Sequence, residues 1–326
     1  MKQRYYIGCD LGGTNIKAGV VDMQVERVLA TESTPTLSHE GPEAVLKRIS
    51  KISQSVVNKA GLNWAEIGGM GVSAPGRLDM EKGETLFLPN LISNWVHIPV
   101  TRILQEQMGK PVYLLNDARA ITYGEWAYGA GKGADCMLCL AIGTGIGGGV
   151  VMNNRLVLTQ GGSAGELGHM TIDVNGPLCG CGNYGCVESF ASGPAIAAMG
   201  VKAVVQGQST KIGELAGYDL NKITPFLIAR AAESGDRVAK QIFETAGACI
   251  GVAVMNAALV VGPQRVVITG GVAAAGDLLL DPIRREVKSR MVVMDPKGIE
   301  ILQGTLGDEA GIIGTAIWAA KRGGLD

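Results

Sequence analysis

Two segments far apart in the chain share one pattern, an apolar strand, a glycine-rich turn and a returning strand. The first covers residues 5–22, with its turn at 11–14, and the second covers residues 137–152, with glycines spread over 143–149. Aligning the two requires a shift of one residue at the turn. A repeated unit of this kind predicts two domains built on the same plan, and no other feature of the sequence constrains the fold as strongly.

Helical patterns alternate with the strands. Val45, Ile49, Ile52 and Val56 recur at three- and four-residue steps and predict a helix over 42–60. Further helices are expected over 118–128, 236–261, 278–290 and 309–322, with a short buried strand over 266–269. This alternation predicts an α/β fold, and 326 residues are enough for about two domains.

The composition excludes several classes of protein. Lys and Arg number 29 against 30 Asp and Glu, a net charge of −1, so a broad basic face for nucleic acid is not expected. Apolar residues make up 47%, which excludes global disorder. The 48 glycines are clustered rather than periodic, which excludes collagen and indicates tight turns or close approach of backbone to ligands.

Membrane and export readings are not favoured. No apolar segment of signal-peptide length precedes Asp10. The stretch 246–262 is short for a spanning helix, which needs about 20 residues, and predicts a buried helix of small residues instead. Four cysteines stand in apolar surroundings, and three cluster among glycines, which fits a reduced, cytoplasmic protein with one metal site. No membrane partner is expected.

The strongest chemical signal is the segment Gly-Glu-Leu-Gly-His at 165–169 followed by Cys179-Gly-Cys181-Gly-Asn-Tyr-Gly-Cys186-Val-Glu188. Three thiols and the His169 imidazole predict a closed, tetrahedral and therefore structural Zn²⁺ site. The alternative is three reduced surface thiols, which a cytoplasmic protein has little reason to expose. Glu166 and Glu188 flank these ligands and could accept hydrogen bonds from a polyol, or could be ordinary solvated glutamates.

Both glycine turns are candidates for phosphate binding. Asp10-Leu-Gly-Gly-Thr14 offers bare backbone N–H groups, a hydroxyl and an acid that could hold Mg²⁺, although an ordinary hairpin turn explains it equally well. Together with the turn at 143–149 it could form opposite sides of a nucleoside triphosphate cleft. Gly270-Gly271, after a buried strand, could admit adenine or ribose, or could simply connect strand to helix. Lys17 could meet a phosphate, although a lysine on a strand more often points into solvent.

Asn116 and Asp117 follow the apolar strand 112–115. An acid at the carboxyl end of such a strand lies where α/β proteins place ligands and could act as a general base. Asn and Asp are also frequent helix N-caps, and the sequence alone favours that role.

Taken together, these segments resemble the ROK family of repressors, open reading frames and kinases, over essentially the whole chain. Its most specific element is Cys-Gly-Cys-Gly-x-x-Gly-Cys-x-Glu; the other motifs are shared with actin-like ATPases more widely. The resemblance implies a two-domain actin-like ATPase (ribonuclease H-like) fold with a cleft between domains, formed by residues 1–117 plus 308–326 and by 118–307. The family's repressors carry a helix-turn-helix ahead of the first motif, whereas nine residues precede Asp10 here.

The resemblance further implies an ATP-dependent kinase acting on the 6-hydroxyl of a hexose. Glucose is preferred, because the stretch 161–188 looks most like bacterial glucokinases. N-acetylglucosamine or N-acetylmannosamine kinase is the alternative, followed by a non-catalytic sugar-sensing regulator and an ATP-hydrolysing assembly protein. A homodimer or higher homo-oligomer is the base-rate expectation.

The resemblance also assigns roles to residues. Asp117 would be the catalytic base. The sugar would be lined by Gly76, Asn90, Asn116, Asp117, Glu166, His169 and Glu188. ATP and Mg²⁺ would be bound by Asp10, Gly12, Gly13, Thr14, Lys17, Thr144, Gly145, Gly270 and Gly271. Zinc would be held by His169, Cys179, Cys181 and Cys186.

Overall fold

The computed structural model describes residues 3–88, 91–159, 162–293, 295 and 298–323, and the contacts among them divide the chain into two compact units. Unit 1 comprises Met1–Gly133, Arg155–Ala164 and Leu306–Asp326. Unit 2 comprises Ala134–Asn154 and Gly165–Thr305. Each unit contains its own sheet and is described separately.

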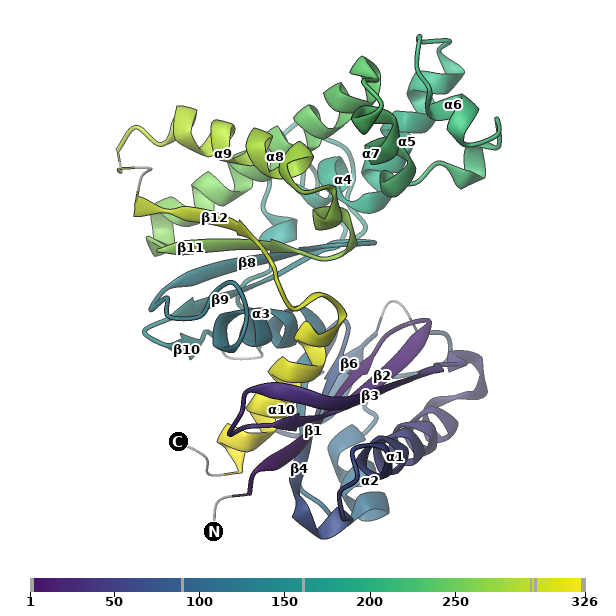
Figure 1. Cartoon of the computed structure of the whole chain (residues 1–326), viewed down its shortest axis with the longest axis vertical. Coiled ribbons are helices and arrows are strands. Elements are labelled where there is room, and N and C mark those ends of the chain that lie inside the picture. Colours follow the sequence, from purple (N-terminus) through teal and green to yellow (C-terminus); the bar gives the residue numbers. More distant parts are fainter. Residues whose placement is uncertain (1–2, 89–90, 160–161, 294, 296–297, 324–326) are drawn as a thin grey trace. The chain divides into compact units, whose positions relative to one another are not determined.

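Unit 1 is built on a five-stranded sheet of order β3-β2-β1-β4-β7 (Figure 1). The strands β1 and β2 form an antiparallel hairpin, whereas β1, β4 and β7 run parallel. The strands of unit 1 are β1 (Tyr5–Leu11), β2 (Asn15–Asp22), β3 (Arg27–Pro35), β4 (Ile67–Ala74), β5 (Arg77–Asp79), β6 (Glu84–Phe87), β7 (Val112–Asn116) and β10 (Arg155–Leu156). Its helices are α1 (Pro42–Lys59), α2 (Val100–Met108), α3 (Asp117–Ala127) and α10 (Ala310–Arg322).

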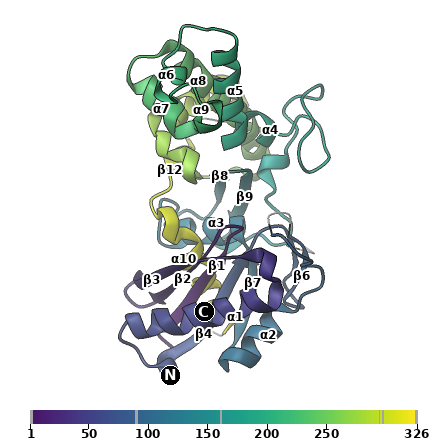
Figure 2. The same ribbon diagram turned by 90° about the vertical axis from the view of Figure 1, so that its right-hand side faces the viewer.

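Helices cover both faces of this sheet. The side chains of β1 alternate between the faces, so Ile7 belongs to the core cluster beneath α1 and α2, and Tyr6 to the cluster beneath α10. The helices α1 and α2 contact each other and are seen side by side in Figure 2. On the other face α10 lies so close to β1 that a Cβ atom at Gly8 would be 1.8 Å from the Ile312 carbonyl oxygen. Glycine is therefore required where this helix crosses the sheet.

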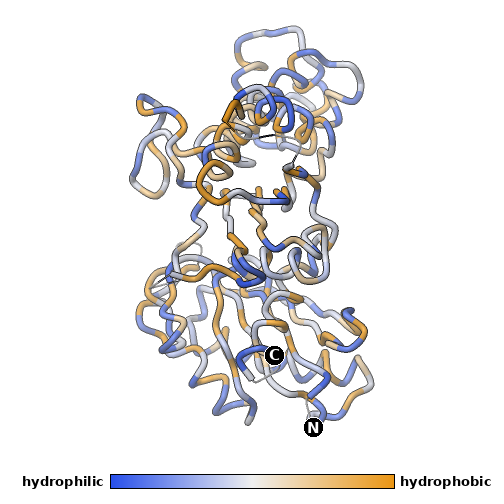
Figure 3. The backbone as a smooth tube through the Cα atoms, turned by 90° about the vertical axis from the view of Figure 1, so that its left-hand side faces the viewer, coloured by the Kyte–Doolittle hydropathy of each residue, from blue (hydrophilic) through white to orange (hydrophobic). Residues whose placement is uncertain are grey.

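Unit 2 repeats the same plan. Its strands follow the order β9-β8-β11-β12, with an antiparallel β8–β9 hairpin and parallel β8, β11 and β12. The buried residues of β8 are hydrophobic, and so are those of β11 except Thr269. Figure 3 colours the chain by hydropathy. The elements of unit 2 are β8 (Met137–Ile142), β9 (Ile146–Met152), β11 (Arg265–Thr269), β12 (Glu300–Gln303), α4 (Glu188–Ala191), α5 (Gly193–Val205), α6 (Ile212–Leu215), α7 (Pro225–Glu233), α8 (Arg237–Val261) and α9 (Asp277–Arg290). The equivalent strand orders confirm the repeat predicted from the two hairpins.

The glycine turn of unit 2 is shorter than the sequence suggests. Glycines spread over 143–149 predicted one long turn, but β9 begins at Ile146, and Gly147, Gly148 and Gly149 pair with β8. These glycines serve packing rather than turning. A Cβ atom at Gly148 would be 2.8 Å from the Gly165 carbonyl oxygen, so the following segment can lie directly on this strand.

The expected boundary at residue 117 also differs from the division by contacts, which comes after Gly133. The helix α3 packs against α10, and both belong to unit 1. Small residues make this contact close, since a Cβ atom at Gly314 would lie 1.8 Å from the Ala120 carbonyl oxygen. By the same division, the segment Leu306–Asp326 with α10 belongs to unit 1.

The long helix α8 begins after the N-cap Asp236, whose carboxylate accepts from the backbone N–H groups of Val238 and Ala239. Among the described residues it is the one helix long and apolar enough, by length and composition alone, to cross a membrane. Its contacts are those of a core helix, because it packs against α4, α5, α7 and α9 within unit 2. The expectation of a buried helix rich in small residues is met here.

Candidate functional site

The four predicted metal ligands of unit 2 converge. One ligand atom from each of His169, Cys179, Cys181 and Cys186 lies within 4.8 Å of all the others. The Cys179 sulfur is 3.7 Å from His169 Nδ1, and the Cys181 and Cys186 sulfurs are 3.8 Å apart. Zn–S bonds of about 2.3 Å in a tetrahedron require sulfur–sulfur edges of about 3.8 Å. The donor set and spacing therefore fit Zn²⁺.

Short backbone bridges fold the chain around this cluster. Thr171 pairs with Cys186, and Leu178 pairs with Tyr184, as isolated antiparallel bridges. Between them the Cys179 amide donates to the Asn183 carbonyl at 2.8 Å. The loop is thus fixed by its own backbone before a metal is considered.

Protonation of the thiols follows their surroundings. Burial raises the pKa of Cys179 to about 12. For Cys181, burial is outweighed by a hydrogen bond from the Asn183 backbone and by bonds from the other two thiols, so its pKa is lowered. Because zinc binds thiolates, metal binding at this cluster would release protons.

The segment 165–169 joins this cluster to the glycine hairpin. Its 3₁₀ turn Leu167–His169 lies against β9, and a Cβ atom at Gly168 would be 1.8 Å from the Ile146 carbonyl oxygen. Glu166 directly precedes this turn, and His169 ends it. The two predicted sugar contacts, Glu166 and His169, thus lie at the two ends of a turn that packs on β9, the strand after the glycine turn.

Glu188 lies between the cluster and the turn. Its Oε2 accepts a hydrogen bond from the Ile146 backbone N–H at 2.8 Å, and its Oε1 accepts from the Cys179 thiol at 3.5 Å. Sequence reasoning placed Glu188 near the sugar but did not foresee its bond to the turn.

A cavity of about 370 Å³ opens beside the same turn. It is lined by Gly143, Thr144, Gly193, Pro194, Ala197, Ile223, Thr224, Pro225, Phe226, Gly271 and Val272. The structure thus brings Thr144 and Gly271, two predicted nucleotide contacts, to one cavity within unit 2. Its remaining lining is mainly apolar and of a kind that accepts a flat ring.

Gly270 connects β11 to the 3₁₀ turn Gly271–Ala275 with φ of 88°. A Cβ atom there would lie 2.5 Å from the Ile142 carbonyl oxygen, at the end of β8. Gly270 is therefore required by the chain path, whereas Gly271 faces open space and is free to meet a ligand.

In unit 1 the predicted residues gather at the carboxyl ends of the parallel strands. Asp10 pairs in register with Ser73, and Asn116 pairs with Ala74. Ser73 Oγ donates to Asp10 Oδ1 at 2.6 Å. This edge is where parallel sheets place their ligands.

Asn116 is the N-cap of α3. Its Oδ1 accepts from the backbone N–H groups of Ala118 and Arg119 and from Arg119 Nη1 at 3.1 Å. Its Nδ2 donates to the Gly76 carbonyl oxygen at 3.2 Å. The structure therefore brings Asn116 and Gly76 together and fixes the orientation of the amide.

Asp117 is the first residue of α3. The sequence favoured a cap at Asn116 or Asp117, and the cap is Asn116. The Asp117 Oδ1 accepts from the Ala118 N–H at 2.8 Å. Its carboxylate thus stands at the helix N-terminus, where negative charge is favourable.

Asp10 is partly buried. Burial raises the pKa of its carboxyl, opposed by the hydrogen bond from Ser73 and the charge of Lys17. A cation near this carboxyl would offset the cost of its burial, so the donor fits Mg²⁺ or its bound water. Lys17, predicted to meet a phosphate, pairs with Asp308 at 3.0 Å.

The first glycine turn is held by Thr36. Its hydroxyl donates to the Gly12 carbonyl oxygen at 2.7 Å, and its backbone N–H donates to the Thr14 carbonyl oxygen at 2.8 Å.

Sequence reasoning missed Thr36 and Ser73, because nothing in their local pattern marks them. It also missed residues 223–226, which line the 370 Å³ cavity, because Thr224-Pro225 looks like an ordinary helix N-terminus. Asn90, predicted to contact sugar, lies outside the described residues.

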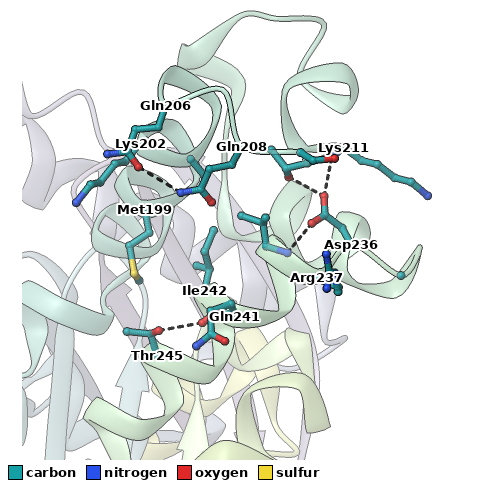
Figure 4. A pocket seen from close by; sticks show the side chains of 15 residues that line it. Met199, Lys202, Gln206, Gln208, Lys211, Asp236, Arg237, Gln241, Ile242 and Thr245 are labelled. Carbon is teal, nitrogen blue, oxygen red and sulfur yellow. Dashed lines mark hydrogen bonds between the residues drawn. The ribbon is translucent and has the colours of Figure 1, made fainter.

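A larger cavity, of about 960 Å³, lies elsewhere in unit 2, between the end of α5 and the start of α8 (Figure 4). None of the predicted site residues lines it. The Asp236 carboxylate within it is engaged by Thr210 and by backbone N–H groups, and the Lys202 and Lys211 side chains point away from each other. The charged side chains named here therefore do not point toward one common ligand position in this cavity.

Comparison with known proteins identifies relatives that match nearly the whole chain. A sequence model described as the ROK family matches residues 6–322. The glucokinase of Thermotoga maritima is 35% identical over 310 residues, 95% of this chain and 95% of its own length. The xylose repressor of Caldicellulosiruptor bescii is 31% identical over 309 residues, 94% of this chain and 76% of its own length.

A crystal structure of a ROK family glucokinase from Streptomyces griseus in complex with glucose and AMPPNP is also similar. It is 32% identical, with a TM-score of 0.84, over 97% of this chain and 99% of that chain. The fold is thus the actin-like ATPase fold expected from the sequence, and the relatives include both glucokinases and xylose repressors.

Proposed function

This chain belongs to the ROK family, and on that basis we propose that it transfers the γ-phosphoryl group of ATP to the 6-hydroxyl of a hexose, with glucose as the preferred acceptor. ATP would occupy the cavity beside Thr144 and Gly271, and the acceptor hydroxyl would be activated by Asp117. The zinc cluster would be structural and would hold His169 and Glu188 at the sugar.

The observation that carries this proposal is the division of roles between Asn116 and Asp117. Asn116 accepts the N-cap hydrogen bonds of α3, so capping does not require an acid at residue 117. A sugar-binding regulator without catalysis would need the fold and the sugar contacts but no base beside them. The presence of Asp117 therefore favours a kinase over the repressor-like alternative.

The reaction needs positioning and charge neutralisation more than covalent help. Asp117 accepts the proton of the 6-hydroxyl as its oxygen attacks the γ-phosphorus, and the bond from this phosphorus to the β–γ bridging oxygen breaks. The products are ADP, sugar 6-phosphate and the proton on Asp117. Mg²⁺, when bound near Asp10, would neutralise charge on the phosphates. The backbone N–H groups of the two glycine turns would hold the phosphate oxygens.

The choice of glucose is supported by the glucokinases among the relatives, at 33–35% identity. N-acetylglucosamine and N-acetylmannosamine differ from glucose at carbon 2 and are the alternative acceptors. A cytoplasmic location and a homo-oligomer remain our expectations for the enzyme.

A sugar panel tests the proposal. Purified protein with Mg²⁺ and ATP is assayed for ADP release with glucose, mannose, N-acetylglucosamine, N-acetylmannosamine, allose and fructose, and without sugar. We expect sugar-dependent ADP release that is fastest with glucose. ADP release independent of any sugar would point to an ATP-hydrolysing assembly protein, and binding of sugar without turnover would point to a regulator.

A further inference from the structure

We propose that Glu188 is a positioning residue for the nucleotide, because its carboxylate braces the glycine turn of unit 2. This role is additional to the sugar contact expected of Glu188, and it rests on the nucleotide site proposed above. Glu188 Oε2 accepts the Ile146 N–H at 2.8 Å, at the point where the turn enters β9.

One short segment anchors the turn at both ends. At its start, the Gly143 carbonyl oxygen accepts from the Gly193 N–H at 2.8 Å, and at its end Ile146 is held by Glu188. Glu188 and Gly193 begin the consecutive helices α4 and α5. Within the turn, the Gly143 N–H donates to the Gly145 carbonyl oxygen at 2.9 Å. Thr144 and Gly145 therefore lie between two residues, Gly143 and Ile146, whose backbones are held by hydrogen bonds.

Such bracing matters for binding because backbone N–H groups bind phosphate well only when they already point at it. If the turn becomes ordered only on binding, the lost conformational entropy weakens the binding free energy, whereas a preorganised turn has no such loss. Acceptance by a carboxylate makes the Ile146 bond a charge-assisted one, which is about twice as strong as a neutral bond.

The two carboxylate oxygens have separate partners. Oε2 faces the turn, and Oε1 lies 3.5 Å from the Cys179 sulfur. When zinc binds and Cys179 becomes a thiolate, its sulfur has no proton to donate to Oε1, so the Ile146 N–H is the partner that defines the brace. The segment that carries the metal ligands supports the phosphate turn as well as the sugar side of the site.

Gly145 offers an independent way to disturb this contact. A Cβ atom at Gly145 would lie 2.5 Å from Glu188 Oε2, and the end of a flexible side chain can move away without disrupting the fold. Gly145→Ala should therefore displace the carboxylate, and its effect on ADP binding is compared with and without the Glu188 side chain.

The experiment is calorimetric titration with ADP and Mg²⁺ in the absence of sugar, so that a sugar contact of Glu188 cannot influence the result. We expect Glu188→Ala to raise the Kd of ADP about tenfold or more, the effect of losing one charge-assisted bond. Glu188→Gln keeps an amide oxygen that can accept from Ile146 but loses the charge, and it should weaken ADP binding clearly less than Glu188→Ala does. Glu166→Ala, which removes a different carboxylate expected at the sugar, should leave ADP binding unchanged.

A double-mutant cycle completes the test. If Gly145→Ala acts by displacing Glu188, it weakens ADP binding in the unsubstituted protein and has no further effect in Glu188→Ala. Equal effects in both backgrounds would mean that the new methyl group hinders the phosphate directly, which contradicts the brace. Thermal unfolding of each variant excludes general loss of structure as the cause.

The outcomes also separate this inference from the proposed function. Failure of the unsubstituted protein to bind ADP would remove the nucleotide site and the brace together. Normal ADP binding by Glu188→Ala would overturn the brace and leave the nucleotide site standing. Equal weakening by Glu188→Gln and Glu188→Ala would show that an acceptor for the Ile146 N–H is not what the turn requires.

Discussion

The two glycine turns occupy equivalent places in their sheets but are held in different ways. In unit 1 the turn after β1 is fixed by Thr36, a neutral hydroxyl that donates to the Gly12 carbonyl oxygen. In unit 2 the turn after β8 is fixed by the Glu188 carboxylate, which accepts from the Ile146 N–H. The first turn is tied to Thr36, the residue directly after β3, and the second to the segment that carries the metal ligands.

This difference suggests a division of labour. Unit 1 places two acids, Asp10 and Asp117, at the carboxyl ends of parallel strands. Unit 2 holds the nucleotide-sized cavity and the cysteine cluster. On the proposed function, unit 1 would supply the base and the metal-binding carboxylate, and unit 2 would supply nucleotide binding and the support of the sugar.

The largest expected effect comes from Asp117→Asn. Loss of a general base costs about 10²–10⁴ in rate, so kcat should collapse. The amide keeps an oxygen for the Ala118 N–H, and Asn116 still caps the helix, so the melting temperature should change little. ADP affinity, measured by titration, should be unchanged if nucleotide binding belongs to unit 2. A near-normal kcat would reduce Asp117 to a helix-terminal charge.

The next effect in size is expected from Cys181→Ser. The variant should lose its zinc in elemental analysis and bind sugar at least about tenfold more weakly, since even changes to the outer-shell partners of metal ligands typically cost about 10–100-fold in metal affinity or activity. His169→Ala should be worse, because it removes a sugar contact as well. ADP binding should fall less than sugar binding in both.

Cys136→Ser controls for the loss of a thiol, since Cys136 lies in unit 2 outside the cluster. Full sugar affinity in a zinc-free Cys181→Ser protein would show that the cluster has no part in the sugar site.

Much of this arrangement could be read from the sequence. Local patterns predicted the repeated hairpins, the helix α1, the metal ligands and the strand before Asn116. The braces could not be predicted, because Thr36 is 24 residues from Gly12, and Glu188 is 42 residues from Ile146. Hydrogen bonds between such distant positions leave no local pattern.

The misread features have the same cause. Gly147–Gly149 looked like part of a turn because glycine in a strand shows no alternation of side chains, and Gly165, whose carbonyl oxygen requires Gly148 to be small, lies further along the chain. The division by contacts after Gly133 depends on the packing of α3 on α10, which joins segments from opposite ends of the sequence.

A smaller effect is expected from Thr36→Val, which keeps the size of a fully buried side chain but leaves the Gly12 carbonyl without its hydroxyl donor. Loss of one neutral hydrogen bond costs about 1 kcal/mol, so the KM for ATP should rise about fivefold with little change in kcat. Thr34→Val, at the end of β3, is the control. A rise larger than that caused by Glu188→Ala would reverse the order of the two braces.

The smallest effect is expected from Lys17→Met. Lys17 pairs with the exposed Asp308, and exposed ion pairs contribute about 0–1 kcal/mol. Steady-state kinetics should show a KM for ATP within about threefold of the unsubstituted enzyme. A tenfold or greater rise would instead make Lys17 a direct phosphate ligand, as the sequence first suggested.

The most direct test of the account follows the transferred phosphorus itself. Phosphorus NMR of a mixture of protein, Mg²⁺, ATP and glucose distinguishes a sugar 6-phosphate from inorganic phosphate. The account predicts that the γ-phosphoryl signal of ATP is replaced by that of a hexose 6-phosphate in step with ADP, and that Asp117→Asn abolishes this conversion. Release of inorganic phosphate alone, or unchanged ATP in the presence of bound glucose, would contradict it.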